Sequence, residues 1–262
     1  MINKVFLIVK QFIKNIKIIT LFLCSLWSFV TPSQSLADTL HLAIASNFIA
    51  PIQHLSKVFE DETGHKLTLS FGSSGKLFAQ IKHGAPYDIF LSADLIKPQT
   101  LIDDQLAKPK SLVIYAKGQL ALWSKATVPL GSLEETLLNA RRIAIANPKL
   151  APYGKAAEES LRYLSLWDKV QHKLVRGENI GQTYQFVYSQ NADIGFVALS
   201  QVQANQTESQ IIKIPNALYS NIDQAAVILT RTNKMTLAES FMTFLMRVDT
   251  QAQIAQFGYS SQ

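Results

Sequence analysis

Two short runs of small polar residues follow apolar stretches of this chain and could bind a ligand. The first is Ser-Asn at positions 46–47, and the second is Gly-Ser-Ser-Gly at positions 72–75. Neither run contains a charged side chain. A strand that ends in such residues and continues as a helix leaves backbone N–H groups without partners, and such groups bind anions. The two runs therefore predict a site for a small oxyanion that is held by neutral donors.

Two further corners of the same kind lie in the second half of the chain, at Pro-Tyr-Gly (152–154) and at Asn-Ile (179–180). Ser and Asn are also the preferred caps of helices, so each corner taken alone has an ordinary structural explanation. In open α/β sheets, however, ligands bind at the carboxyl ends of the strands, where all four corners are expected. The four corners together favour a binding site.

Other kinds of chemistry fit the sequence less well. The segment 72–76 lacks the spacing of a phosphate-binding P-loop, and it lacks the Gly-x-Ser-x-Gly spacing of a serine hydrolase. The five histidines are scattered without the spacing of metal ligands, and Cys24 is the single cysteine. We therefore predict no catalytic residue, no cofactor and no dedicated metal site.

The elements that must position these corners alternate between strand-like and helix-like segments, which is typical of a largely parallel sheet covered by helices. One long strand is predicted over 111–124 and another strand over 225–230. A loop is predicted over 147–154, and helices are predicted over 49–63 and 155–164. The predicted fold is α/β with two lobes and the ligand in the cleft between them. The predicted boundaries are 38–120 plus 217–262 for lobe I and 121–216 for lobe II.

Residues 1–37 are predicted to be a cleaved secretory signal peptide, because lysines precede an apolar run that ends in Ser35-Leu36-Ala37. The apolar run is shorter than the ~20 residues of a membrane-spanning helix. Lipidation at Cys24 is an alternative that the bulky residue before it disfavours. Four lysines of this segment contribute to the net charge of +6, so the basic balance does not indicate a nucleic-acid partner.

The sequence also resembles a known family. The segments 43–48, 59–64, 70–75, 80–94 and 147–154 resemble the periplasmic molybdate-binding proteins of ABC importers, and the Gly-Ala-Pro-Tyr-Asp-Ile-Phe-Leu-Ser-Ala-Asp block at 84–94 is specific. The resemblance covers essentially all of the chain after residue 37. It implies a two-lobed solute-binding fold that closes on a tetrahedral oxyanion and then docks on a membrane permease.

The resemblance also implies which residues bind the ligand. It assigns this role to Ser46 and Asn47 on the first corner, Ser74 on the second, Tyr153 on the third and the backbone of Ile180 on the fourth. Some members of the family place a ligand-binding tyrosine at the end of a later strand. This chain has Ala198 there, so we expect Tyr153 to supply the phenol from the other side of the cleft.

The resulting expectation is a monomeric periplasmic receptor that captures molybdate and tungstate, with molybdenum bound only as its oxyanion, and delivers it to an ABC permease. Two alternatives remain open from the sequence. A receptor for sulfate or thiosulfate would show the same contact chemistry. A secreted enzyme that acts on phosphate or sulfate esters would need a nucleophile or a base near the corners.

Overall fold

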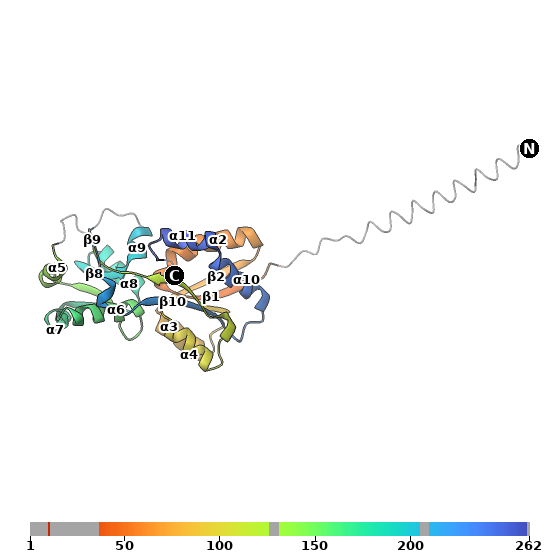
Figure 1. Cartoon of the computed structure of the whole chain (residues 1–262), viewed down its shortest axis with the longest axis horizontal. Helices are drawn as coiled ribbons and strands as arrows, with labels where there is room; N and C mark the ends of the chain where they lie inside the picture. Colours follow the sequence, from red (N-terminus) through yellow and green to blue (C-terminus); the bar gives the residue numbers. More distant parts are fainter. Residues whose placement is uncertain (1–9, 11–36, 126–130, 205–209, 261–262) are drawn as a thin grey trace, which may run out of the picture. The chain divides into compact units, whose positions relative to one another are not determined.

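The computed structural model describes residue 10 and residues 37–125, 131–204 and 210–260 (Figure 1). Asp38–Gln262 is the compact unit that contains both sheets. Except for Lys10 and Ala37, the predicted signal peptide and Cys24 lie outside the described residues, so the cleavage and lipidation hypotheses stay predictions. Among the described helices, none combines the length and the apolar character that crossing a bilayer requires.

The first sheet has the strand order β2-β1-β3-β10-β4. β1 pairs in parallel with β2 and β3, whereas β10 is antiparallel to β3 and β4. Its strands are β1 (Thr39–Ala45), β2 (Lys66–Gly72), β3 (Ile89–Ser92), β4 (Val113–Gly118) and β10 (Ile222–Ile228). The accompanying helices are η2 (Ser46–Phe48), α2 (Ile49–Thr63), α3 (Ser74–Lys82), α4 (Ile96–Asp103), η3 (Pro109–Ser111), α10 (Met235–Met246) and α11 (Val248–Gln256). We call this part lobe I.

The second sheet repeats the arrangement with the order β7-β6-β8-β5-β9. β6 pairs in parallel with β7 and β8, and β5 is antiparallel to β8 and β9. Its strands are β5 (Leu120–Ser124), β6 (Ile143–Ala146), β7 (Leu174–Gly177), β8 (Ile194–Ala198) and β9 (Gln210–Lys213). The accompanying helices are α5 (Leu133–Asn139), α6 (Pro152–Tyr163), α7 (Trp167–Val170), η4 (Gln171–Lys173), α8 (Ile180–Tyr188), α9 (Leu199–Ala204) and η5 (Asn216–Leu218). We call this part lobe II. The two sheets confirm the predicted two-lobed α/β fold, but the prediction of mostly parallel sheets is wrong, because each sheet has two parallel and two antiparallel strand pairs. The antiparallel pairs arise because β10 and β5 enter their sheets after the chain has crossed from the other lobe.

The chain crosses between the sheets twice, at Gln119 and again over 214–221. The sequence predicted one continuous strand over 111–124, and this is wrong. β4 ends at Gly118 and β5 begins at Leu120 in the other sheet. The carbonyl oxygen of Gln119 accepts the backbone N–H of Leu199 over 2.9 Å, so this residue no longer pairs within the first sheet.

Each lobe has its own apolar core. In lobe I, Phe59 of α2 packs edge-on against Phe241 and Phe244 of α10, with ring centroids 5.4 and 5.3 Å away. In lobe II, Trp123 of β5 stacks on Tyr184 of α8 at 4.6 Å between ring centroids. Because each sheet packs against helices of its own lobe, the ends of its strands keep fixed positions within that lobe.

The register of the parallel strands places the predicted corners in pairs. The last residues of β1 and β2, Ala45 and Gly72, are direct neighbours in lobe I. The last residues of β6 and β7, Ala146 and Gly177, are direct neighbours in lobe II. Since parallel strands end at the same edge of a sheet, the first two corners lie side by side, and so do the last two.

Candidate anion-binding site

All four corners line one small cavity between the lobes. Its wall contains each of the five residues that the sequence analysis selected. The lining residues are Ala45, Ser46, Asn47, Gly72, Ser73, Ser74, Ala93, Ala151, Pro152, Tyr153 and Ile180. The volume open to the centre of a water molecule is about 10 Å³, roughly the space of one water. A tetrahedral oxyanion of five atoms therefore needs the lobes to move apart before it can bind.

Four helices begin at this cavity: η2, α3, α6 and α8. Ala45 and Ala151, which precede η2 and α6, have no side-chain group that could cap the helix. Ser73 and Asn179 cap α3 and α8, but each accepts only the third N–H of its helix. Helix geometry leaves the earlier N–H groups without intrahelical acceptors, and the helix dipoles favour negative charge there.

The side chains of the first corner are already hydrogen-bonded. Ser46 Oγ donates to Asn179 Oδ1 over 3.2 Å and accepts the backbone N–H of Gly181 over 3.3 Å. Asn47 Nδ2 donates to Gln224 Oε1 at 2.8 Å and to the Tyr259 hydroxyl at 3.0 Å. The amide nitrogen of Asn47 is therefore committed inside lobe I, and its backbone N–H is the donor left for a ligand.

Ser74, the first residue of α3, offers a hydroxyl proton to the cavity. Its Oγ accepts the backbone N–H of Ala93 over 3.0 Å, and the structure records no acceptor for its hydrogen among the described residues. The preceding Ser73 has a different role, because its Oγ accepts the backbone N–H of Lys76 and caps α3. The two adjacent serines thus divide into one that stabilises the helix and one whose hydroxyl is available.

Tyr153 lies in the first turn of α6, because this helix begins at Pro152 and not at Lys155 as the sequence predicted. Proline suits a first helical position, where its missing N–H has no acceptor in any case. The Tyr153 hydroxyl accepts Gln224 Nε2 over 3.1 Å. Burial raises the pKa of this phenol well above 10, so it carries its proton at neutral pH.

Ile180 is the first residue of α8 and contributes only its backbone. Asn179 caps this helix by accepting the N–H of Gln182 over 3.0 Å, which leaves the N–H of Ile180 without an acceptor within the helix. The carbonyl oxygen of Ile180 accepts Gln201 Nε2 over 3.1 Å and so holds the corner against α9.

The residues that sequence reasoning missed lie behind the cavity. Gln224 is fully buried, and it was overlooked because the predicted strand began only at Ala225. Gly118 was read as the interior of a long strand. A Cβ atom on Gly118 would lie 2.2 Å from the Tyr153 hydroxyl, so only glycine lets this phenol reach Gln224. The available signal was Gln224 itself, a polar residue directly before the apolar run 225–228.

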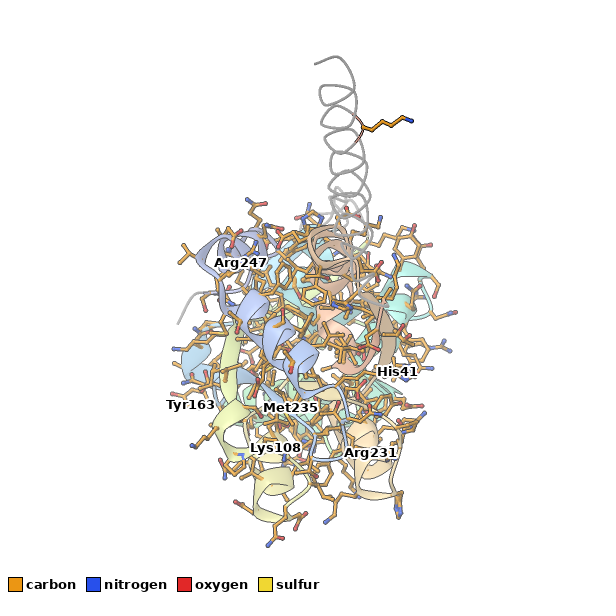
Figure 2. The ribbon with its side chains drawn as sticks, turned by 90° about the vertical axis from the view of Figure 1, so that its right-hand side faces the viewer. His41, Lys108, Tyr163, Arg231, Met235 and Arg247 are labelled. Carbon is orange, nitrogen blue, oxygen red and sulfur yellow. The ribbon has the colours of Figure 1, made fainter. Side chains whose placement is uncertain are left out.

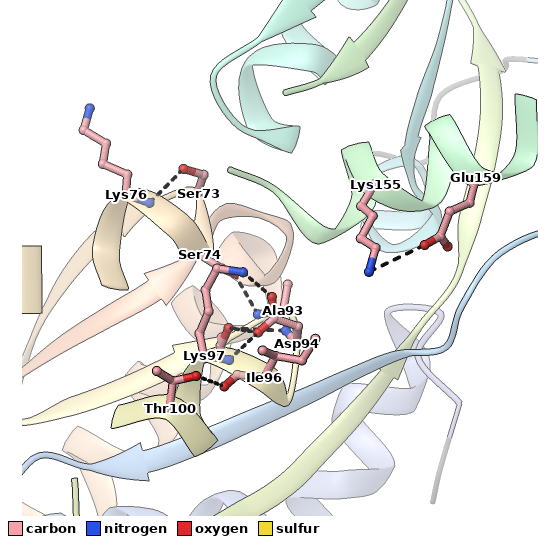
Figure 3. Close-up of polar contacts among 11 residues, drawn as sticks. Ser73, Ser74, Lys76, Ala93, Asp94, Ile96, Lys97, Thr100, Lys155 and Glu159 are labelled. Atoms are coloured by element: carbon pink, nitrogen blue, oxygen red, sulfur yellow. Dashed lines mark hydrogen bonds and ion pairs between the residues drawn. The ribbon is translucent and has the colours of Figure 1, made fainter. Parts of the chain in front are cut away.

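The described lining has no ionisable side chain except the phenol of Tyr153. A second cavity of about 330 Å³ lies beside it and shares Ala151 and Pro152 with it. Two pairs of opposite charges lie on its wall: Lys155 with Glu159, as Figure 3 shows, and Lys97 with Asp94. The ammonium groups of these two pairs are therefore neutralised by carboxylates of the same helix or its adjoining turn.

The lobes touch each other directly around the cavity. The backbone N–H of Gly75 donates to the carbonyl oxygen of Leu150 over 2.8 Å. On the rim, Lys76 of lobe I forms an ion pair with Glu178 of lobe II at 2.9 Å. These contacts and the Ser46 bonds hold the two pairs of corners face to face.

Two other features of the described residues bear on ligand chemistry. No three His, Cys, Asp or Glu side chains gather closely enough there to hold a metal ion. A larger groove of about 970 Å³ lies between α10 and the segment around Lys108, with Met235 on its helical wall (Figure 2). This groove contains none of the residues that the sequence analysis selected.

Comparison with known proteins connects this geometry to a family. The family model described as "Bacterial extracellular solute-binding protein" matches residues 40–260. The molybdate-binding protein ModA of Rhodobacter capsulatus is 38% identical over 220 residues, which cover 83% of this chain and 86% of that protein. ModA of Azotobacter vinelandii is 39% identical over 230 residues, 86% of this chain and 91% of that protein.

A solved structure agrees with these sequence comparisons. The periplasmic molybdate-binding protein of Azotobacter vinelandii superposes with a TM-score of 0.82 at 37% sequence identity. The match covers 85% of this chain and 99% of that chain. The similarity therefore extends over both lobes and over all four corners.

Proposed function

The chain belongs to the family of bacterial extracellular solute-binding proteins, and we propose that it captures molybdate for an ABC importer. The observation that carries the proposal is the convergence of four helix starts on one cavity whose lining has no charged side chain. Such donors could hold several oxyanions. We choose molybdate among them because the similar proteins are named as molybdate-binding proteins.

Neutral donors suit a dianion. The available donors are the hydroxyls of Ser74 and Tyr153 and backbone N–H groups at the helix starts, among them those of Asn47 and Ile180. Each hydrogen bond to a charged group contributes about 1.5–3 kcal/mol, and each helix start adds about 0.3–1 kcal/mol. Tungstate has the same tetrahedral shape and charge as molybdate, so we propose that the site binds both.

Hydrogen phosphate is expected to bind more weakly, because its proton needs an acceptor. The described lining contains no carboxylate. The side-chain oxygen without a hydrogen-bond partner there is Asn47 Oδ1, a neutral amide oxygen. Sulfate carries no proton at neutral pH, so we propose that discrimination against sulfate comes from the size of the site.

Binding and release require the lobes to move. Ligand access breaks the contact between Gly75 and Leu150, and the two crossings at Gln119 and 214–221 are the connections about which the lobes can rotate. We propose that the closed monomer in the periplasm docks on the permease and opens there. We propose a binding role, which is supported by the names of the two ModA proteins and of the superposed structure, all described as molybdate-binding.

A thermal-shift panel tests the function. Purified protein is heated with molybdate, tungstate, sulfate, thiosulfate or phosphate. A ligand at 100 times its Kd stabilises a protein by about 2.7 kcal/mol, which raises the melting temperature by roughly 5–10 °C at this size. We expect that shift with molybdate and tungstate. An equal shift with phosphate would contradict the role of the neutral lining, and a shift with sulfate or thiosulfate alone would identify a different receptor.

A further inference from the structure

A chain of five buried side chains runs from the C-terminal segment to the cavity: Tyr259, Asn47, Gln224, Tyr115 and Tyr153. They come from distant parts of the sequence, and all are nearly or fully inaccessible to solvent. Buried polar groups that are hydrogen-bonded to one another take a single arrangement, because each unpaired group costs free energy. The direction of hydrogen bonds in such a chain can therefore be deduced from its ends.

The direction is fixed at one end by a backbone carbonyl, which can only accept. The Tyr259 hydroxyl donates to the carbonyl oxygen of Asn47 over 2.9 Å, so the phenol oxygen is left as an acceptor. It accepts Asn47 Nδ2 at 3.0 Å, and this orients the Asn47 amide. The same Nδ2 donates to Gln224 Oε1 at 2.8 Å.

The Tyr115 hydroxyl lies 3.0 Å from Gln224 Oε1 and 3.4 Å from the carbonyl oxygen of Ser92, and it can donate to either oxygen, so Asn47 Nδ2 is the group that fixes the Gln224 amide. With this donor directed at Oε1, the other end of the amide is the NH₂ group. Nε2 then donates to the Tyr153 hydroxyl over 3.1 Å. The reversed amide would place its NH₂ group against Asn47 Nδ2, which can only donate, and would lose the bond to Asn47.

We propose that Gln224 is a positioning residue for ligand specificity: it donates to the oxygen of Tyr153 and so commits the phenol proton to the bound anion. The inference rests on the proposed oxyanion-binding function. The wall formed by Tyr153 then offers a donor and never an acceptor. Fully deprotonated oxyanions are favoured, and oxyanions that carry a proton are disfavoured on this side of the cavity.

The protonation of the three phenols is compatible with this arrangement. Burial raises the pKa of Tyr115 and Tyr153 well above 10 and that of Tyr259 to about 12. Each hydroxyl therefore has a proton to donate across the physiological range. Gly118 completes the arrangement, since a side chain there would separate Tyr153 from Gln224.

The test is a double-mutant cycle on the full protein, with molybdate binding measured by isothermal calorimetry. The variants are Gln224→Met, which has a similar shape without donors or acceptors of this kind, Tyr153→Phe, and the two combined. We expect Tyr153→Phe to weaken binding about 10-fold or more and Gln224→Met about 5-fold or more. In the Tyr153→Phe background, Gln224→Met should weaken binding less than about 2-fold, because its effect passes through the absent hydroxyl.

Gln251→Met is the control, because Gln251 is a partly buried glutamine of lobe I whose Nε2 donates to the backbone oxygens of Tyr115 and Leu245. This variant should leave the molybdate Kd unchanged. A second readout is the ratio of the phosphate Kd to the molybdate Kd, which should fall in Gln224→Met and stay at the wild-type value in Gln251→Met. If Gln224→Met does not fold by circular dichroism, Gln224→Glu replaces it in the same cycle.

Equal losses from the residue 224 variant in both backgrounds would overturn the inference, as would an unchanged Kd in Tyr153→Phe. Either result leaves the proposed function intact, provided that the wild-type protein binds molybdate. Absence of molybdate binding by the folded wild-type protein would instead overturn the proposed function.

Discussion

The backbone N–H of Gly75 donates to the carbonyl oxygen of Leu150 over 2.8 Å, which joins the first turn of α3 in lobe I to the loop before α6 in lobe II. A Cβ atom at position 75 would lie 2.9 Å from that oxygen and 3.0 Å from the Leu150 Cα. The second corner therefore requires glycine at this position because the opposite lobe approaches its backbone, and not because of an unusual backbone angle.

Replacement of this glycine should hinder closure of the lobes. Because the added methyl group of Gly75→Ala contacts Leu150 only when the lobes meet, we expect the molybdate affinity to fall about 10-fold or more. The free energy of unfolding should change by less than about 1 kcal/mol, since alanine is favoured over glycine within a helix. Calorimetry and urea unfolding measure the two effects. A loss of stability without a loss of affinity would show that the methyl group disturbs lobe I itself.

The ion pair on the rim should matter far less than this backbone contact. Lys76 and Glu178 are 50% and 44% exposed, and exposed ion pairs contribute about 0–1 kcal/mol. Lys76→Met should therefore change the molybdate Kd by less than about 5-fold. Any effect should disappear in 1 M salt, where the screening length is about 3 Å. A large effect that persists in high salt would mean that Lys76 attracts the anion directly.

The two adjacent serines of the second corner should separate binding from stability. Ser74→Ala removes a hydroxyl that is available to the ligand, so we expect affinity to fall about 10-fold. Ser73→Ala removes the cap of α3 and should lower the free energy of unfolding by about 1 kcal/mol, with a change in Kd below about 3-fold. Calorimetry and urea unfolding on both variants check the assignment. The reverse pattern would identify Ser73 as the ligand-binding hydroxyl.

Alkaline pH should destabilise the fold through its buried phenols. Burial raises the pKa of Tyr259 in the folded state to about 12, above the value near 10 in the unfolded chain. The unfolded state therefore loses its proton first, and stability falls as the pH rises from about 10 to 12. With two pKa units between the states, this tyrosine accounts for a loss of about 2 kcal/mol by pH 12.

Urea unfolding between pH 8 and pH 11 measures this loss. Tyr259→Phe is the control, because phenylalanine has no phenol to titrate. Its stability should decline less steeply with pH than that of the wild-type protein, whatever its stability at pH 8. Parallel curves for the two proteins would contradict the assignment of the decline to Tyr259.

Much of the fold was predictable because the signals are local. The helix over 49–63 was predicted with its observed bounds, since the apolar spacing and the glycine that ends it lie within the segment. The break at Gln119 was not predictable, because both flanking segments are apolar and strand-like. They belong to different sheets, and membership of a sheet depends on partners far away in the sequence. The start of α6 at Pro152 was missed because a proline followed by tyrosine and glycine also suits a loop.

The sequence by itself determined the four corners and their uncharged character, because a strand end, a helix start and the residues between them are neighbours in the chain. It placed the five selected residues on those corners. Tertiary structure decided which of their donors are available. Asn47 is committed through Gln224 and Tyr259, which lie 177 and 212 residues away, whereas Ser74 and Tyr153 keep a proton for the cavity. The physical reason is that a polar side chain acquires its direction from its hydrogen-bond partners, and in this protein those partners are distant in sequence.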